Sequence, residues 1–150
     1  MILGAHGLHI ELPHGWSGRI FSRDAGLATL HAGDFRLTLD DGQFGDASTG
    51  EMPPVASFIA LTEYGAGSGL APGHGLFSPR RIPRPLDPTG FAATRLAHPR
   101  RGQAGMQHFF TESGRPMCLY VVLAGGRPVR RRQLAVLDHL LGSLQIARRA

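Results

Sequence analysis

The chain contains no lysine and only one cysteine, and the low cysteine content limits the kinds of site that it can form. All 16 basic residues are arginine, which a GC-rich genome explains most simply because it favours arginine codons. The lone Cys118 excludes an internal disulfide and any zinc site built from cysteines. Because Cys118 lies within an apolar run, we expect an inert thiol in the core.

Long hydrophobic runs are also missing. No run approaches the ~18 apolar residues that a membrane-spanning helix needs. Residues 1–6 lack the charged and apolar parts of a signal peptide, so we expect a cytoplasmic protein. With 150 residues, of which 42% are hydrophobic and 18% charged, the chain fits one globular domain over residues 1–150.

The last third of the chain has the clearest pattern. Residues 106–112 and 116–124 are apolar runs separated by a Ser-Gly pair at 113–114, which predicts two strands and a tight turn. This turn places Phe110 opposite Met117. Both faces of the hairpin are largely apolar, which favours a central position in a covered sheet.

A helix is predicted over residues 131–144, after a Gly-Gly-Arg-Pro breaker. Its leucines recur at helical spacing and form one apolar stripe, so the helix belongs on the sheet. The stripe consists of Leu134, Leu137, Leu140, Leu141 and Leu144.

Several other segments have the alternation or apolar content of strands, while residues 40–54 are predicted to form a loop with one helical turn. Together the patterns predict an α+β fold, an antiparallel β-sheet of about six strands with a C-terminal amphipathic helix packed on it. The other predicted strand segments are 7–12, 18–23, 27–31, 35–39, 55–64 and 91–97.

Charge is divided unequally along the chain. Residues 1–75 hold 3 arginines and 8 acidic residues, whereas residues 76–150 hold 13 arginines and 3 acidic residues. The two halves therefore carry net charges of −5 and +10. This division indicates either an acidic partner or halves that complement each other within or between molecules.

The connection over residues 65–90 is the best candidate for a binding loop, because structureless connections of such length are usually functional. It holds 26 residues, with 6 glycines and 5 prolines. Apolar anchors, Leu70 among them, alternate there with arginines, as at protein-binding rims. Alternatively, the apolar residues fold back over the sheet. The predicted contacts are Leu76, Phe77, Arg80, Arg81, Ile82 and Arg84.

A second candidate surface is the basic face at the start of the predicted helix, formed by Arg130, Arg131 and Arg132. Arginines gathered in this way also suit nucleic acid or anionic lipid headgroups. No nucleic-acid recognition motif or aromatic ladder accompanies them, so a solvated basic face or a contact with a protein partner is the preferred interpretation.

No catalytic, metal or cofactor site is predicted. The glycine-rich residues 65–69 follow a strand, but no helix follows to complete a phosphate-binding loop. The eight histidines show no metal-binding spacing, and Asp40, Asp41 and Asp46 do not match a calcium loop. A small-molecule carrier remains an alternative, and it needs a pocket between sheet and helix.

Two patterns resemble the PsbP-like superfamily, which includes the Mog and DcrB proteins. The first is Leu-Pro-His-Gly-Trp at residues 12–16, and the second combines Leu-Tyr-Val-Val at 119–122 with the leucine-rich end of the helix at 137–144. The chain also resembles uncharacterised small proteins of actinobacteria. The resemblance implies an antiparallel sheet with helices packed on it, and binding or assembly instead of catalysis. The sequence departs from the superfamily in lacking a long helix between the early strands, which only residues 46–52 could supply.

We therefore expect a non-catalytic protein-binding, assembly or chaperone-like adaptor. A nucleic-acid or anionic-lipid binder and a small-molecule carrier are the alternatives.

Overall fold

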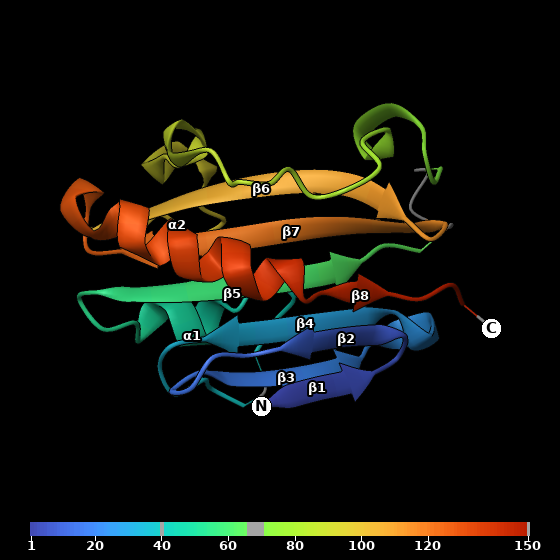
Figure 1. The fold of residues 1–150 in the computed structure, drawn as a ribbon, viewed down its shortest axis with the longest axis horizontal. Helices are drawn as coiled ribbons and strands as arrows, with labels where there is room; N and C mark the ends of the chain where they lie inside the picture. Colours follow the sequence, from blue (N-terminus) through green and yellow to red (C-terminus); the bar gives the residue numbers. More distant parts are fainter. Residues whose placement is uncertain (40, 66–70, 150) are drawn as a thin grey trace.

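The computed structural model describes residues 1–39, 41–65 and 71–149. In these residues, eight strands form two antiparallel sheets (Figure 1). The larger sheet has the strand order β3-β4-β5-β7-β6, and the smaller one β1-β2-β8. The predicted α+β class is confirmed, with the strands divided between two sheets. The strands are β1 (Ile2–Ala5), β2 (Leu8–Glu11), β3 (Ser17–Ser22), β4 (Ala28–Gly33), β5 (Ala56–Glu63), β6 (Gln103–Glu112), β7 (Arg115–Ala124) and β8 (Gln145–Ile146).

Helical segments connect or cover these strands. The described residues contain α1 (Asp46–Gly50), α2 (Arg127–Gly142) and the short 3-10 helices η1 (Asp24–Gly26), η3 (Gly75–Phe77), η4 (Pro88–Gly90) and η5 (Ala93–Arg95). The carboxylate of Asp41 accepts hydrogen bonds from the backbone N–H of Ala47 and Ser48, at 2.9 and 3.1 Å. These bonds satisfy free amides of α1 and explain the single helical turn expected within residues 40–54.

The hairpin of β6 and β7 has the predicted register. Phe110 pairs with Met117, and Ser113 and Gly114 at the turn have φ angles of 54° and 72°. Both angles lie in the left-handed region that two-residue hairpin turns of this kind require. Every residue of β7 is buried, because β5 and β6 flank it and both faces of the sheet are covered. The predicted central strand is confirmed.

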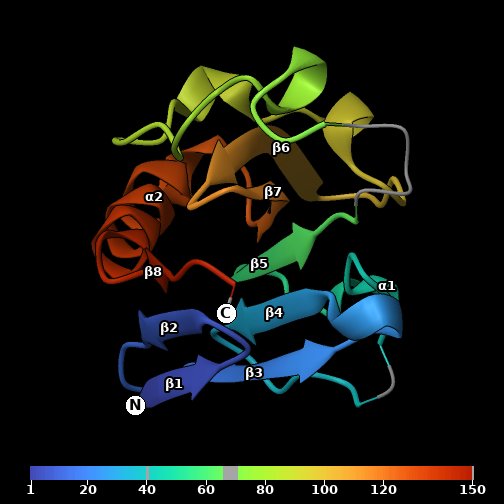
Figure 2. The same cartoon turned by 90° about the vertical axis from the view of Figure 1, so that its right-hand side faces the viewer.

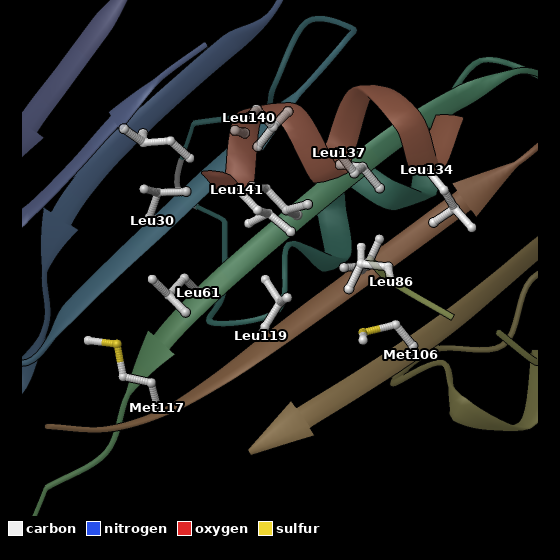
Figure 3. Packing of buried hydrophobic residues seen from close by; sticks show 14 of the residues in the cluster. Leu30, Leu61, Leu86, Met106, Met117, Leu119, Leu134, Leu137, Leu140 and Leu141 are labelled. Carbon is white, nitrogen blue, oxygen red and sulfur yellow. The ribbon is translucent and has the colours of Figure 1, made fainter. Parts of the chain in front are cut away.

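Helix α2 lies across one face of the larger sheet (Figures 1 and 3). It begins at Arg127 instead of residue 131, because Pro128 suits the first turn, where a backbone N–H has no helical partner. It ends at Gly142 instead of residue 144, and β8 then pairs with β2. Four leucines of the predicted stripe are buried, namely Leu134, Leu137, Leu140 and Leu141, whereas Leu144 lies beyond the helix and is partly buried.

Apolar clusters cover both faces of the larger sheet. On one face, α2 and the smaller sheet pack against Ile59 and Leu61 of β5. On the other face, Phe58 of β5 packs with Tyr120 of β7 and with partly buried residues of the segment that contains α1. Figure 2 shows α2, β8, β2 and β1 on one side of this sheet and α1 on the other. The alternation in β5 follows the pattern predicted for residues 55–64.

Two segments predicted as strands are not strands. Residues 35–39 leave the sheet after β4, and the backbone N–H of Thr38 bonds to Ser48 Oγ at 2.9 Å. Residues 91–97 form η5 and a single isolated bridge to β6 at Ala92. Both segments are connections whose alternating apolar side chains pack against the sheet. The alternation therefore reflects burial of these side chains and not membership of a strand.

Strand β1 was not expected from the sequence. It pairs with β2 through a turn at His6 and Gly7, whose φ angles are 50° and 80°. Most residues of β1 are exposed, so they show no alternation of polar and apolar side chains. The strand predicted over residues 7–12 is confirmed as β2, in which Leu8 and Ile10 are buried.

Candidate functional site

Residues 79–91, here called the covering segment, run along the outer edge of β6 and then reach α2 (Figure 1). At the first end, the backbone N–H of Thr111 in β6 donates to Pro79 O at 2.7 Å. Further along, the N–H of Leu86 donates to Asp138 Oδ1 of α2 at 2.8 Å. The predicted binding loop is therefore attached to both the sheet and the helix.

A groove of about 740 Å³ lies between the covering segment and the first half of α2. Its floor is apolar, because Leu86, Phe91 and Leu134 are buried beneath it (Leu86 and Leu134 are labelled in Figure 3). The volume falls in the range typical of ligand pockets. The other lining residues are Pro85, Pro88, Thr89, Arg127, Arg130, Arg131, Ala135 and Asp138.

Three arginines of α2 line this groove. Arg127, Arg130 and Arg131 follow the i, i+3, i+4 spacing that places residues on one face of a helix. Within the described residues, none of the three forms an ion pair. Asp138 has the only carboxylate among the lining residues, and its Oδ1 already accepts the N–H of Leu86. The groove is therefore cationic.

Arg130 shows this imbalance most clearly. Its guanidinium carbon lies 6.0 Å from the centroid of the Phe91 ring, and its Nε is buried without a hydrogen-bond partner in the described structure. The N-terminal end of α2 adds a partial positive charge to the same region. An anionic group in the groove would meet three guanidinium groups above an apolar floor.

The apolar residues predicted to bind a partner are mostly part of the fold. Phe77 is fully buried, with its ring centroid 5.4 Å from Tyr64 and 5.7 Å from Phe109. Ile82 is half-buried and packs against the larger apolar cluster. Leu76, in contrast, remains 53% exposed. The alternative in which apolar loop residues fold back over the sheet is therefore confirmed for Phe77 and Ile82.

Leu70 lies outside the described residues, as does most of the glycine-rich segment at 65–69, and Asp40 does too. The loop arginines are all exposed. Arg84 reaches the C-terminal end of α2, where a Cβ placed on Gly142 would lie 2.7 Å from its Nη1. A cation there interacts favourably with the negative end of the helix.

The structure brings together Arg130 and Arg131 of the predicted basic face and separates Arg132. Arg132 lies on the opposite flank of α2, beside Trp16. Sequence reasoning missed Arg127 because it started the helix too late. The available signal was Pro128, since proline favours the first helical turn. A helix that starts there has Arg127 on the same face as Arg130 and Arg131.

Leu86, Phe91 and Asp138 were also missed as site residues. No sequence pattern distinguishes them, because they meet only when the covering segment folds onto α2. Leu86 and Phe91 lie far from the helix in sequence, and Asp138 reads as an ordinary polar position of an amphipathic helix.

A second charged cluster joins the chain ends to the sheet. The buried carboxylate of Glu63 accepts hydrogen bonds from Arg115 Nε and Nη2, at 2.9 and 3.1 Å, and from Arg149. Arg115 also donates to the backbone oxygens of His6 and Ala147. Burial raises the pKa of Glu63, but the hydrogen bonds from the two arginines outweigh it and lower the pKa to about 2. These groups satisfy one another, so we assign the cluster to the fold.

Neither a reactive thiol nor a metal cluster occurs among the described residues. Burial raises the pKa of the Cys118 thiol to about 12, so it is protonated at neutral pH. No group of three or more histidine, cysteine, aspartate or glutamate side chains in the described ranges is placed to hold a metal ion. Leu137 and Leu141 of α2 are buried in the apolar cluster that lies between this helix and the sheet, where a carrier would need its pocket, and Phe110 is buried in the same cluster.

None of the described helices is long and apolar enough to cross a membrane. No protein-family model matches the chain, and neither a curated protein nor a solved structure matches it. The similarity to the PsbP-like superfamily therefore stays a prediction from the sequence.

Proposed function

We propose that this protein is a non-catalytic binding or assembly protein whose groove holds an acidic, partly apolar segment of a cytoplasmic protein partner. One observation carries the proposal. Arg127, Arg130 and Arg131 have no acidic partner in the described structure and stand around an apolar floor. Guanidinium groups bind carboxylates with charge-assisted hydrogen bonds, while the floor takes an apolar anchor.

The apolar floor favours a protein segment over a nucleic acid. Binding to a phosphate backbone depends mainly on cations and needs no apolar surface between them. Leu86, Phe91 and Leu134 would be left without a contact by a phosphate chain lying over the arginines. An acidic peptide with a leucine or phenylalanine anchor uses both features of the groove.

Fluorescence anisotropy with labelled peptides tests this function. The first peptide carries one phenylalanine and one leucine among glutamates, the second replaces both apolar residues by serine, and the third replaces the glutamates by lysine. We expect the first to bind at least ~5-fold more tightly than the second, because burying two apolar side chains is worth more than 1 kcal/mol. The third should not bind.

Charge-reversal variants locate the site. Arg131→Glu should weaken binding of the first peptide ~10-fold or more, because it replaces an attraction by a repulsion at the groove. Arg101→Glu makes the same charge change at an exposed arginine outside the groove and should alter affinity less than ~2-fold. Equal losses in both variants would show that the groove is not the site.

Two further arms address the rival occupants and the loop. Duplex DNA or phosphatidylserine vesicles that bind more tightly than the first peptide in 0.15 M salt would favour the nucleic-acid or lipid function.

Replacing Arg80, Arg81 and Arg84 together by alanine should weaken peptide binding by ~2- to 5-fold, as expected of exposed charges at a rim. Unchanged affinity would remove these three arginines from the binding surface.

A further inference from the structure

The connection between β4 and β5 carries most of the acidic charge in the first half of the chain. Residues 34–51 hold five of the eight acidic residues of residues 1–75 and one of its three arginines, so this segment has a net charge of −4. Among its described carboxylates, only that of Asp46 forms ion pairs, with Arg100 and His98. The segment therefore presents acidic charge that the rest of the described structure does not neutralise.

Leu39 belongs to this acidic segment and is 74% exposed, more than any other large apolar side chain that the structure describes. Glu51 lines the same hollow of the surface as Leu39. The N–H of the preceding residue, Thr38, donates to Ser48 Oγ at 2.9 Å, so α1 holds the chain next to Leu39 in place. A segment that is already held loses less conformational freedom when it binds. An exposed apolar side chain among acidic residues has the chemistry that we propose for the occupant of the groove.

The acidic segment and the groove lie on opposite faces of the larger sheet. Phe35 and Leu37 pack with Phe58 on the face that α1 covers, whereas α2 covers the other face (Figure 2). Leu39 therefore cannot enter the groove of its own molecule, and only a second molecule can bring it there. Because the two contact surfaces differ, such an association is heterologous and joins molecules head to tail.

The separation of charge favours this arrangement over a symmetric pair. Residues 1–75 carry a net charge of −5 and residues 76–150 one of +10, and the strand order places β3 and β4 at one end of the larger sheet and β6 and β7 at the other. A two-fold contact through either end would bring like charges together. A head-to-tail contact instead sets the acidic end of one copy against the basic end of the next.

We propose that the occupant of the groove is a second copy of this chain. Its Leu39 packs on the apolar floor, and the carboxylates of its acidic segment meet the arginines that line the groove. This inference deepens the proposed function and rests on it. One apolar anchor and a few exposed charges make a small interface, so the association is weak, with a Kd of ~0.1 mM.

Sedimentation velocity between ~10 μM and ~1 mM protein in 0.15 M salt tests this inference. The mass of the wild-type protein should rise with concentration beyond that of a dimer. Leu39→Asp removes the anchor and Arg131→Glu reverses a charge of the groove, so each should weaken association ~10-fold or more. Ile2→Asp makes the same apolar-to-acidic change at a residue of the acidic half that is 64% exposed, and it should alter association less than ~2-fold.

A mixture of the two defective variants gives the sharpest result. Leu39→Asp keeps an intact groove, and Arg131→Glu keeps an intact Leu39. Equal amounts of the two should therefore associate again, but the mass should stop at that of a dimer, because the second contact surface of each partner is defective.

A mixture that stays monomeric would overturn the inference, as would an equal loss of association in Ile2→Asp and Leu39→Asp. Wild-type association that stops at a dimer would show a closed contact instead of a head-to-tail one. A wild type that is monomeric at ~1 mM but still binds the first test peptide would overturn self-association alone. Loss of both kinds of binding would overturn the proposed function as well.

Discussion

At the scale of single residues, Glu63 is a buried charge at the centre of an ion-pair cluster with Arg115 and Arg149. Its side chain is 2% exposed and that of Arg115 is 3% exposed. The attraction between the two charges therefore has to offset the hydration that each of them loses on folding. Through Arg115, this carboxylate also holds the turn at His6 and the chain near Ala147, at opposite ends of the sequence. Removing the carboxylate would leave a buried guanidinium without its counter-charge.

We predict that Glu63→Gln lowers the free energy of unfolding by ~3–5 kcal/mol at pH 7, as measured by urea denaturation followed by Trp16 fluorescence. The folded pKa of about 2 lies below the ordinary value of 4.5, so the wild-type contribution is complete above pH ~4.5 and disappears as pH falls towards 2. The variant should lose this part of the acid dependence. Asp24→Asn, at an exposed carboxylate, should change stability by less than ~0.5 kcal/mol.

A loss below ~1 kcal/mol in Glu63→Gln, or an acid dependence equal to that of the wild type, would contradict this account of the cluster.

At the scale of elements, the covering segment is attached to α2 by one hydrogen bond between Leu86 and Asp138. The Leu86 side chain is 3% exposed, so burial supports the same attachment. A bond to a carboxylate is worth ~1.5–3 kcal/mol, which is enough to set how often the segment opens.

We predict that Asp138→Ala speeds amide hydrogen exchange over residues 79–91 by ~10-fold or more, with little change in β5 or β7. The reason is that the opening of this segment no longer has to break the bond to Asp138. Asp138→Asn keeps an acceptor oxygen and should restore part of the protection. Asp87→Ala removes a local bond to Thr89 without touching α2 and serves as the control. Equal exchange in Asp138→Ala and wild type would show that burial alone holds the segment.

A helix or strand could be predicted from the sequence where only one kind of structure produces the observed pattern. The β6–β7 hairpin followed from a Ser-Gly turn between apolar runs, and the buried stripe of α2 followed from leucine spacing. Residues 35–39 and 91–97 failed because a loop that packs on a sheet buries alternate residues as a strand does. The groove could not be predicted from the sequence, because residues 85–91 and α2 meet through contacts that no local pattern encodes.

At the scale of the whole molecule, the division of charge along the sequence becomes a division in space. Strands β1 to β4 belong to the acidic half and lie at one end, while β6, β7, the covering segment and α2 belong to the basic half and lie at the other (Figure 2). The strand order places β5 between the two ends. A charge arrangement of this kind would orient the acidic partner proposed above before contact, and it would guide such a partner towards the groove.

This polarity predicts how fast the acidic test peptide associates. In stopped-flow measurements its association rate constant should fall ~10-fold or more between 0.02 and 0.5 M salt, because the Debye length shrinks below the distance over which the basic end attracts it. Arg101→Glu, in the basic half, should slow association ~2-fold at low salt, whereas Arg36→Glu, the same change at an exposed position of the acidic half, should have a smaller effect. Neither variant should change the dissociation rate, since neither residue lines the groove. Equal slowing by both variants would mean that net charge alone, and not its separation between the two ends, governs the encounter.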